Sequence, residues 1–256
     1  MKKNLFLSII FLTLFTNIYA QHFIDKAVIE YEVKANLRKS MGSGMWADMM
    51  KDKLPEFNVG YYTLTFANNK SIYKFDHWDK SAVPEYFRKP DEGNVWFYDF
   101  NKGEYNKQKN IYGSNINISD SIQNLHWKLS NENRMIAGFN CRKATAILFD
   151  SVYVFAFYTE EMTFPGGPFS INGLPGTILG VTIPRLYTSW IATKVMVNNV
   201  NENVIKPITA KKIFSKKEFK DLLDERTKDW YYNTTDANEL KEMQEEKARF
   251  MWNSFL

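Results

Sequence analysis

The stretch Gly60–Asp76, GYYTLTFANNKSIYKFD, decides the fold class of this chain. Its two halves, 60–67 and 70–76, are rich in aromatic and β-branched residues, which favour strands. Asn68 and Asn69 separate the halves, and asparagine tolerates the positive φ that a two-residue hairpin turn requires. We therefore predict two antiparallel strands joined by a tight turn.

Further strands are expected on both sides of this hairpin. Residues 27–38 alternate between apolar and polar side chains, and residues 95–100 and 104–109 flank a second turn signal, Asn101-Lys102-Gly103. Neighbouring strands joined by short turns are typical of an antiparallel meander. The same reasoning predicts strands near 122–130, 141–149, 152–159, 186–198 and 204–213.

The hydrophobic period changes near residue 215. Ser215 and Glu218 form a capping-box sequence, and apolar residues follow at helical spacing. Asp236 and Glu239 form a similar start for a second helix. We predict a mainly β protein with C-terminal helices from about residue 215, in which helices cover a curved antiparallel meander sheet or open barrel.

The first twenty residues have the order of a secretory signal peptide. Two lysines precede an apolar run over 5–15, and Ala20 precedes the expected cleavage site. A membrane anchor is the alternative, but this apolar run is short for a bilayer span and no second span follows. We expect residues 1–20 to be removed on export and 21–256 to form a single domain without an integral membrane span.

Net charge and cysteine content narrow the function classes. Removing residues 1–20 also removes two lysines, so the formal charge falls from +4 to +2. This near-neutral balance argues against nucleic acid as the main partner. Cys141 is the only cysteine, so the exported chain has no internal disulfide. We expect Cys141 to be a small buried apolar residue and not a reactive thiol.

Glycine and proline concentrate in one segment, Thr163–Gly180, with the sequence TFPGGPFSINGLPGTILG. It holds five of the twelve glycines and three of the eight prolines. Proline fixes φ and glycine permits positive φ, so we expect successive sharp reversals that pack the apolar residues inward. Leu174–Thr177 suits a type II turn, with Pro175 at the second corner and Gly176 at positive φ.

This Gly/Pro segment also carries a family resemblance. Gly173-Leu174-Pro175-Gly176, followed by Ile178 and Leu179, resembles the signature of the GLPGLI family, a group of exported Bacteroidetes proteins of unknown function. Thr177 stands where the family usually has leucine. The resemblance implies export, a mostly β domain and, by analogy, association with outer-membrane receptor systems. Three upstream elements extend it: Trp127-Lys128-Leu129, residues 136–144 and Tyr158-Thr159-Glu160-Glu161.

Candidate chemistry is sparse. The chain has three histidines, and it lacks the Gly-x-Ser-x-Gly, His-Glu-x-x-His and phosphate-loop patterns. Asp76-His77-Trp78-Asp79 is the densest group of potential ligands, and oxygen and imidazole ligands suit a divalent ion. The alternative, which we favour, is a polar loop with a surface histidine, so no metal or other cofactor is expected.

Glu161 adjoins the Gly/Pro segment and is the one candidate for acid or base catalysis. Its neighbour Glu160 would diverge from it on an extended chain. The alternative, which we favour, is that Glu161 pairs with Arg142 or Lys143 across the sheet or with backbone N–H groups in the following turns, because half-buried carboxylates are normally paired.

Met41, Met45 and Met49 stand at the spacing i, i+4, i+8 and would form one stripe on a short helix. Thioether ligands suit Cu(I), and a methionine stripe also suits an adaptable docking surface or a lid over an apolar cavity. The alternative, which we favour, is a helix that packs on the sheet.

Two functions are compatible with these features. The first is an exported, non-catalytic binding or accessory protein of the periplasm or cell surface, with an apolar ligand, a peptide or an envelope protein as its partner. The second is a hydrolase of an envelope glycan or peptide, with Glu161 as the acid or base. A groove lined mainly by apolar residues would favour the first, and convergent polar groups near Glu161 would favour the second.

Overall fold

The computed structural model describes residues 23–42, 45–80, 83–85, 88, 92–230 and 236–256. The predicted signal peptide over residues 1–20 lies outside this part of the chain, so its export and cleavage stay predictions. No helix of the described residues is long and apolar enough to cross a membrane.

One antiparallel sheet of eleven strands forms the framework, in the order β6-β5-β4-β3-β2-β1-β11-β10-β9-β8-β7. From β1 in the middle of the sheet, successive strands step outward to the edge at β6. The chain then crosses to the opposite edge at β7 and steps back to β11 beside β1. The edge strands do not pair, so the predicted curved sheet is open. The strands are β1 (Ala27–Asn36), β2 (Phe57–Ala67), β3 (Lys70–Trp78), β4 (Val95–Asp99), β5 (Glu104–Ile111), β6 (Ser114–Ser121), β7 (Lys128–Ile136), β8 (Phe139–Leu148), β9 (Val152–Thr159), β10 (Thr177–Ile183) and β11 (Thr188–Met196).

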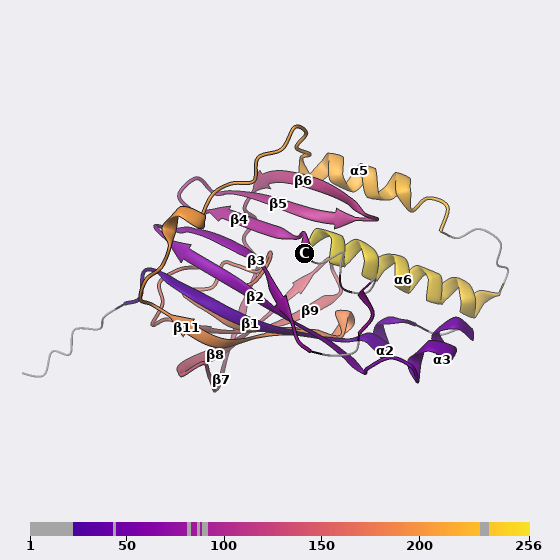
Figure 1. Ribbon diagram of the computed structural model, residues 1–256, viewed down its shortest axis with the longest axis horizontal. Helices are drawn as coiled ribbons and strands as arrows, with labels where there is room; N and C mark the ends of the chain where they lie inside the picture. Colours follow the sequence, from indigo (N-terminus) through magenta and orange to yellow (C-terminus); the bar gives the residue numbers. More distant parts are fainter. Residues whose placement is uncertain (1–22, 43–44, 81–82, 86–87, 89–91, 231–235) are drawn as a thin grey trace, which may run out of the picture.

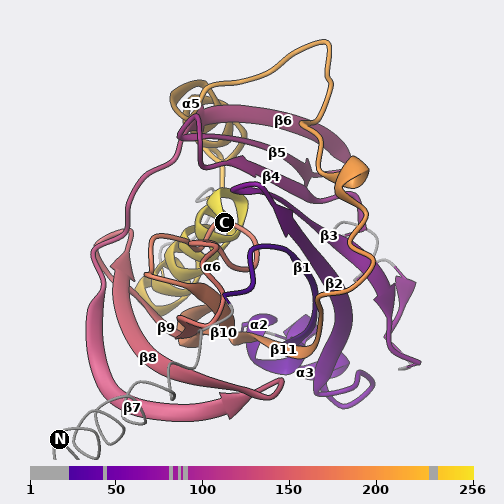
Figure 2. The same cartoon turned by 90° about the vertical axis from the view of Figure 1, so that its left-hand side faces the viewer.

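The helices lie towards one end of the sheet (Figure 1), and the end of α6 enters its curve (Figure 2). They are α2 (Leu37–Ser40), α3 (Met45–Lys51), α5 (Lys216–Arg226) and α6 (Ala237–Phe255). Both predicted caps of the C-terminal helices are confirmed. Ser215 and Glu218 form the reciprocal capping box of α5, and the Asp236 carboxylate accepts from the Asn238 and Glu239 N–H groups in the first turn of α6.

The predicted methionine helix is wrong as a single element. Met41 is the C-cap of α2, and Met45 begins α3. Between them Gly42 has a φ of +72°, a conformation that ends a helix. The three methionines therefore do not form one helical stripe, and Met49 is 54% exposed. The side chain of Met45 lies outside the described residues.

The strand predictions are confirmed where turn chemistry marks the boundaries. Asn68 and Asn69 have φ values of 52° and 56°, as the β2–β3 hairpin requires, and Gly103 has a φ of 68° in the β4–β5 turn. Two predictions need correction. The strand expected at 122–130 starts only at Lys128, and 204–213 contains no strand. Two observed strands, β6 and β10, were not predicted from the sequence.

The core lies on the concave side of the sheet. Ala27, Ile29 and Tyr31 of β1 alternate along the strand and are fully buried at its centre. Figure 2 shows the sheet curving around the end of α6 and around the Gly/Pro segment between β9 and β10. Leu256, just after α6, belongs to the same apolar cluster and is 7% exposed. The inside of the curve is therefore filled by two segments distant in sequence.

Candidate functional site

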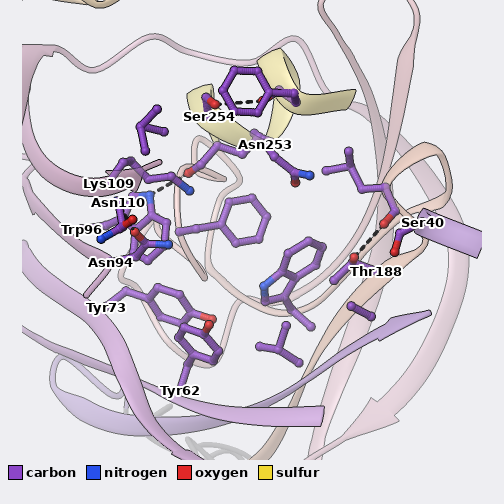
Figure 3. A pocket seen from close by; sticks show the side chains of 18 residues that line it. Ser40, Tyr62, Tyr73, Asn94, Trp96, Lys109, Asn110, Thr188, Asn253 and Ser254 are labelled. Carbon is purple, nitrogen blue, oxygen red and sulfur yellow. Dashed lines mark hydrogen bonds between the residues drawn. The ribbon is translucent and has the colours of Figure 1, made fainter. Parts of the chain in front are cut away.

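A cavity of about 350 Å³ remains between the concave face of the sheet, the Gly/Pro segment and α6. We call it the aromatic cavity (Figure 3). Its polar lining comes from Ser40, Asn94, Lys109, Asn110, Thr188, Asn253 and Ser254. Its aromatic lining comes from β2, β3, β4 and β11, the Gly/Pro segment and α6: Tyr62, Tyr73, Trp96, Phe169, Trp190 and Phe250.

Cross-strand neighbours build the aromatic wall. Tyr73 of β3 stands directly opposite Trp96 of β4, and their rings lie 5.4 Å apart. Tyr62 of β2 stacks on the other side of Tyr73 at 5.3 Å with an interplanar angle of 9°. Such cross-strand aromatic pairs stabilise a sheet, so the wall is part of the framework.

The polar groups of the aromatic cavity are held in place. Trp96 Nε1 donates to the Leu256 oxygen at 2.6 Å, which ties β4 to the end of α6. Lys109 is 9% exposed, and its Nζ lies 5.0 Å from the centre of the Trp96 ring. The Ser254 hydroxyl donates to the Phe250 carbonyl within α6 at 2.8 Å.

The Gly/Pro segment packs inward, as predicted. Phe164 stacks on Phe66 of β2 at 4.6 Å, and Phe169 packs on Trp190 of β11 at 4.5 Å. Phe169 has a φ of 43°, which is strained for a bulky residue. Its burial and its contact with Trp190 hold it in that conformation, which directs the ring into the aromatic cavity.

The predicted type II turn at Leu174–Thr177 is wrong. Gly176 has positive φ, as predicted, but its value of 159° is far from the value near 80° of that turn. The Thr177 N–H donates to the Met162 carbonyl, so the turn lacks its closing bond. Glycine is required for another reason, because a Cβ at position 176 would lie 2.1 Å from the Thr159 carbonyl oxygen.

The other signature residues are structural. Leu174 is 2% exposed, and Ile178 and Leu179 are fully buried, so none of them presents a surface to a partner. Gly173 has a φ of 87°, and its N–H donates to the Pro165 carbonyl at 3.0 Å. Thr177 is fully buried, and its hydroxyl donates to the Phe164 carbonyl at 2.9 Å. That bond accounts for a polar residue where the resembled family has leucine.

Glu161 lies in a different place, a cleft of about 560 Å³ that we call the polar cleft. No residue lines both this cleft and the aromatic cavity. The Glu160 and Glu161 side chains are exposed. The lining comes from the segment before β1, from β7, β8 and β9, and from the start of the loop after β9: Phe23, Ile24, Asn133, Asn140, Arg142, Tyr158, Thr159, Glu160 and Glu161.

The predicted pairing of Glu161 is not observed among the described residues. Arg142 Nε donates to the Ser130 carbonyl at 2.6 Å, and Lys143 pairs with Glu132 at 2.5 Å. The Tyr158 hydroxyl lies 3.4 Å from a Glu160 oxygen, and burial followed by the charge of Glu160 raises the pKa of Tyr158. Polar groups therefore converge near Glu161 without fixing its carboxylate.

The other candidates are scattered. Asp76 and His77 are exposed at the end of β3, where the His77 Nδ1 lies 2.7 Å from a carboxylate oxygen of Asp76. The His77 ring stacks on Tyr61 at 4.6 Å. Within the described part of the chain, no group of three His, Cys, Asp or Glu side chains is placed to hold a metal ion. Cys141 is fully buried, as predicted, and burial raises its pKa to about 12.

Comparisons with known proteins bear on the fold. No family model matches the chain, and no curated protein matches it in sequence. The chain is similar to the solved structure of PNGF-II in two crystal forms. In space group P21 the TM-score is 0.50, with 14% identity over 77% of this chain and 33% of that chain. In space group C2 the TM-score is 0.49, with 15% identity over 85% and 32%.

A third similar structure is an uncharacterized conserved protein from Thermus thermophilus. Its TM-score is 0.37 and its identity 7%, over 74% of this chain and 90% of that chain. The chain spans about a third of the length of PNGF-II. At 14% identity the comparison with the P21 form of PNGF-II supports a shared β fold and transfers no activity.

Proposed function

We propose that this chain is an exported binding protein that holds an apolar ligand in the aromatic cavity. The observation that carries the proposal is the aromatic cavity itself, whose walls are six aromatic side chains from four strands, the Gly/Pro segment and α6. Concave, mostly apolar sites with few polar groups are typical of ligand pockets. A volume of about 350 Å³ is near the lower end of such pockets, so a ligand of one or two rings, or a short acyl chain, fits best.

The polar groups would orient this ligand. Lys109 and Asn94 stand on one side of the aromatic cavity, and Ser40 and Thr188 stand on another (Figure 3). A ligand with one polar end would place that end towards Lys109 and its apolar body against Trp190 and Phe169. The pattern of residues 1–20 and the family resemblance support export to the periplasm or cell surface.

Two measurements test the proposal. Native mass spectrometry of the protein purified from its own cell envelope should show a retained small molecule that denaturation releases. Titration with the neutral apolar dye N-phenylnaphthylamine should then quench tryptophan fluorescence, because Trp96 and Trp190 line the aromatic cavity. The absence of both a retained molecule and dye binding would contradict the proposal.

A pair of variants at neighbouring positions locates the binding. Ala35 lines the aromatic cavity, whereas its neighbour Lys34 is exposed and lies over the ring of Phe57. Ala35→Leu should reduce dye affinity by about tenfold or more, because the larger side chain occupies part of the volume. Lys34→Leu should leave the affinity unchanged. Equal effects of the two variants would place the dye elsewhere.

The polar cleft supports a second candidate, hydrolysis of an envelope glycan or peptide. Its specific support is the convergence of Arg142, Tyr158, Glu160 and Glu161 around one open volume. Glu161 would act as the acid or base. The test is turnover of isolated envelope glycan and peptide fractions by the native chain and by Glu161→Gln. Turnover by the native chain but not by Glu161→Gln would establish hydrolase activity that depends on Glu161. Equal turnover by the two proteins would show that Glu161 is not the acid or base.

A further inference from the structure

A second cavity, of about 240 Å³, lies beyond Leu256, which lines both this cavity and the aromatic cavity. Part of its wall is the segment 122–127, which carries the chain from β6 to β7. We call it the lysine cavity. Its apolar lining includes Leu125, Ile147, Leu148 and Phe149, and its polar lining includes Lys107 and Asn172.

Lys107 is a buried lysine in the wall of this cavity. It is 3% exposed, and its Nζ donates to the Phe255 carbonyl at 2.5 Å. Among the described residues no Asp or Glu side chain lies within ion-pair distance of Lys107. Burial, and then the charges of Lys109 and Lys216, hold the pKa of Lys107 well below its ordinary value. A lysine in this environment favours an arriving anion.

Asn172 is the second buried polar residue of the lysine cavity, and its side-chain oxygen lacks a hydrogen-bond donor among the described residues. It is 5% exposed, and its Nδ2 donates to the Ser170 carbonyl at 3.2 Å. Its side-chain oxygen is buried and has no hydrogen-bond partner among the described residues. Its backbone oxygen accepts from Trp127 Nε1 at 2.9 Å, which ties Asn172 to the segment 122–127. A buried amide oxygen without a donor is unfavourable, so this position suits a ligand N–H or O–H group.

We propose that the lysine cavity binds a small carboxylic acid that carries an apolar body and one N–H or O–H donor. The carboxylate accepts from Lys107 Nζ, the donor binds Asn172 Oδ1, and the apolar body packs on Leu125 and Ile147. An N-acylated apolar amino acid has this chemistry, and so does the C-terminal residue of an apolar peptide. A volume of about 240 Å³ limits the buried part to about one such residue. This site is separate from the aromatic cavity and does not depend on the function proposed for it.

The first test compares an acid with its amide on the full chain. Isothermal titration with N-acetyl-leucine should show binding, and N-acetyl-leucinamide should bind at least about tenfold more weakly because it lacks the charge that Lys107 recognises. Equal binding of the two probes, or no binding of the acid, would overturn the proposal. Tighter binding of N-acetyl-alanyl-leucine than of N-acetyl-leucine would identify a peptide terminus as the ligand, and weaker binding a free acyl amino acid.

The second test uses two lysines two residues apart on β5. Lys107→Met should weaken N-acetyl-leucine binding at least about tenfold. Lys109→Met should change it by a smaller factor, because Lys109 lines the aromatic cavity and acts on Lys107 only through its charge. Melting curves check that both variants fold. The reverse result would place the acid in the aromatic cavity, which would overturn this inference and leave the function proposed for that cavity intact.

Proton uptake gives an independent readout. A carboxylate beside Lys107 favours its charged form, so binding above the pKa of the empty site takes up a proton. The dissociation constant should then rise about tenfold per pH unit in that range. Titrations in two buffers with different ionisation enthalpies should give different apparent heats in the native chain and equal heats in Lys107→Met. Equal heats in the native chain would contradict contact between the acid and Lys107.

Discussion

The aromatic cavity and the polar cleft differ in how firmly their side chains are held. The lining of the aromatic cavity is stacked, largely buried and tied to α6 through the bond from Trp96 to the Leu256 oxygen. The carboxylates of the polar cleft are exposed, and the Tyr158 hydroxyl lies 3.4 Å from an oxygen of Glu160. Binding and stability should therefore be coupled in the aromatic cavity and independent in the cleft, because packed interiors resist local change.

The largest expected effect concerns Gly176 of the Gly/Pro segment, which lies against Thr159 of the polar cleft, whereas Phe169 of the same segment lines the aromatic cavity. Gly176→Ala should lower the free energy of unfolding by about 3 kcal/mol or more, because the added Cβ meets the Thr159 carbonyl oxygen. Gly138→Ala is the control, since its φ is 88° but no atom lies within 4 Å of the added Cβ. Chemical denaturation of both variants measures the difference, and equal destabilisation would refute the steric argument.

The second effect is a dependence of the free energy of unfolding on pH that comes from Lys107, a residue that does not line the polar cleft. Burial lowers the pKa of Lys107, so between that value and the pKa of the unfolded chain the unfolded state binds more protons. The free energy of unfolding should therefore rise with pH in that window, by at most about 1.4 kcal/mol per pH unit from this group. Denaturation at several pH values should show a smaller slope in Lys107→Met than in the native chain. The exposed Lys102→Met is the control, and an unchanged slope in Lys107→Met would contradict the prediction.

A third variant tests the coupling of binding and stability in the aromatic cavity. Phe169→Leu keeps an apolar residue at the strained φ of 43° but removes the ring that packs on Trp190. We expect it to lower the free energy of unfolding by about 1 kcal/mol and to weaken dye binding as well. Tyr153→Leu, at an exposed position that lines neither cavity, should leave dye binding unchanged. Unchanged dye binding in Phe169→Leu would show that the Phe169 ring does not contact the bound dye.

The smallest effect is expected in the polar cleft. Glu161→Gln should change the free energy of unfolding by less than about 0.5 kcal/mol, because the side chain is exposed and forms no ion pair within the described residues. Thermal melting at neutral pH measures this. A large loss of stability would show that other groups of the protein bind the Glu161 carboxylate. The proposed difference between the aromatic cavity and the polar cleft would then be wrong.

The sequence predicted most of the fold where local chemistry determines it. Paired asparagines mark the β2–β3 turn and a capping box starts α5, and both features depend on residues close together in the chain. The failures came from long-range effects. β10 overlaps the end of the Gly/Pro segment and forms a strand because β9 and β11 pair with it on both sides.

The candidate site was less predictable for the same reason. Lys107 and Lys109 follow the alternation of an ordinary half-exposed strand, and lysine normally indicates the solvent face. Both are buried because the end of α6 and its following residue lie over this face of β5, and nothing near residues 107–109 encodes that contact. The aromatic wall also depends on register, since Tyr73 meets Trp96 only after the strands have paired. The inward packing of the Gly/Pro segment, by contrast, was correctly predicted from its own apolar residues.

The strand order has a consequence for how the chain acquires its structure. β1 comes before the other ten strands in the sequence, but one of its two neighbours is β11. The backbone of Val28, for example, can pair with Met196 only after β11 has been synthesised. Until then a half-finished sheet presents an open edge of backbone N–H and C=O groups that any other strand can capture. Contacts this distant in sequence are slow to form. The chain should therefore refold slowly and aggregate from its nascent state, and it should need a holding chaperone until its last strand is available.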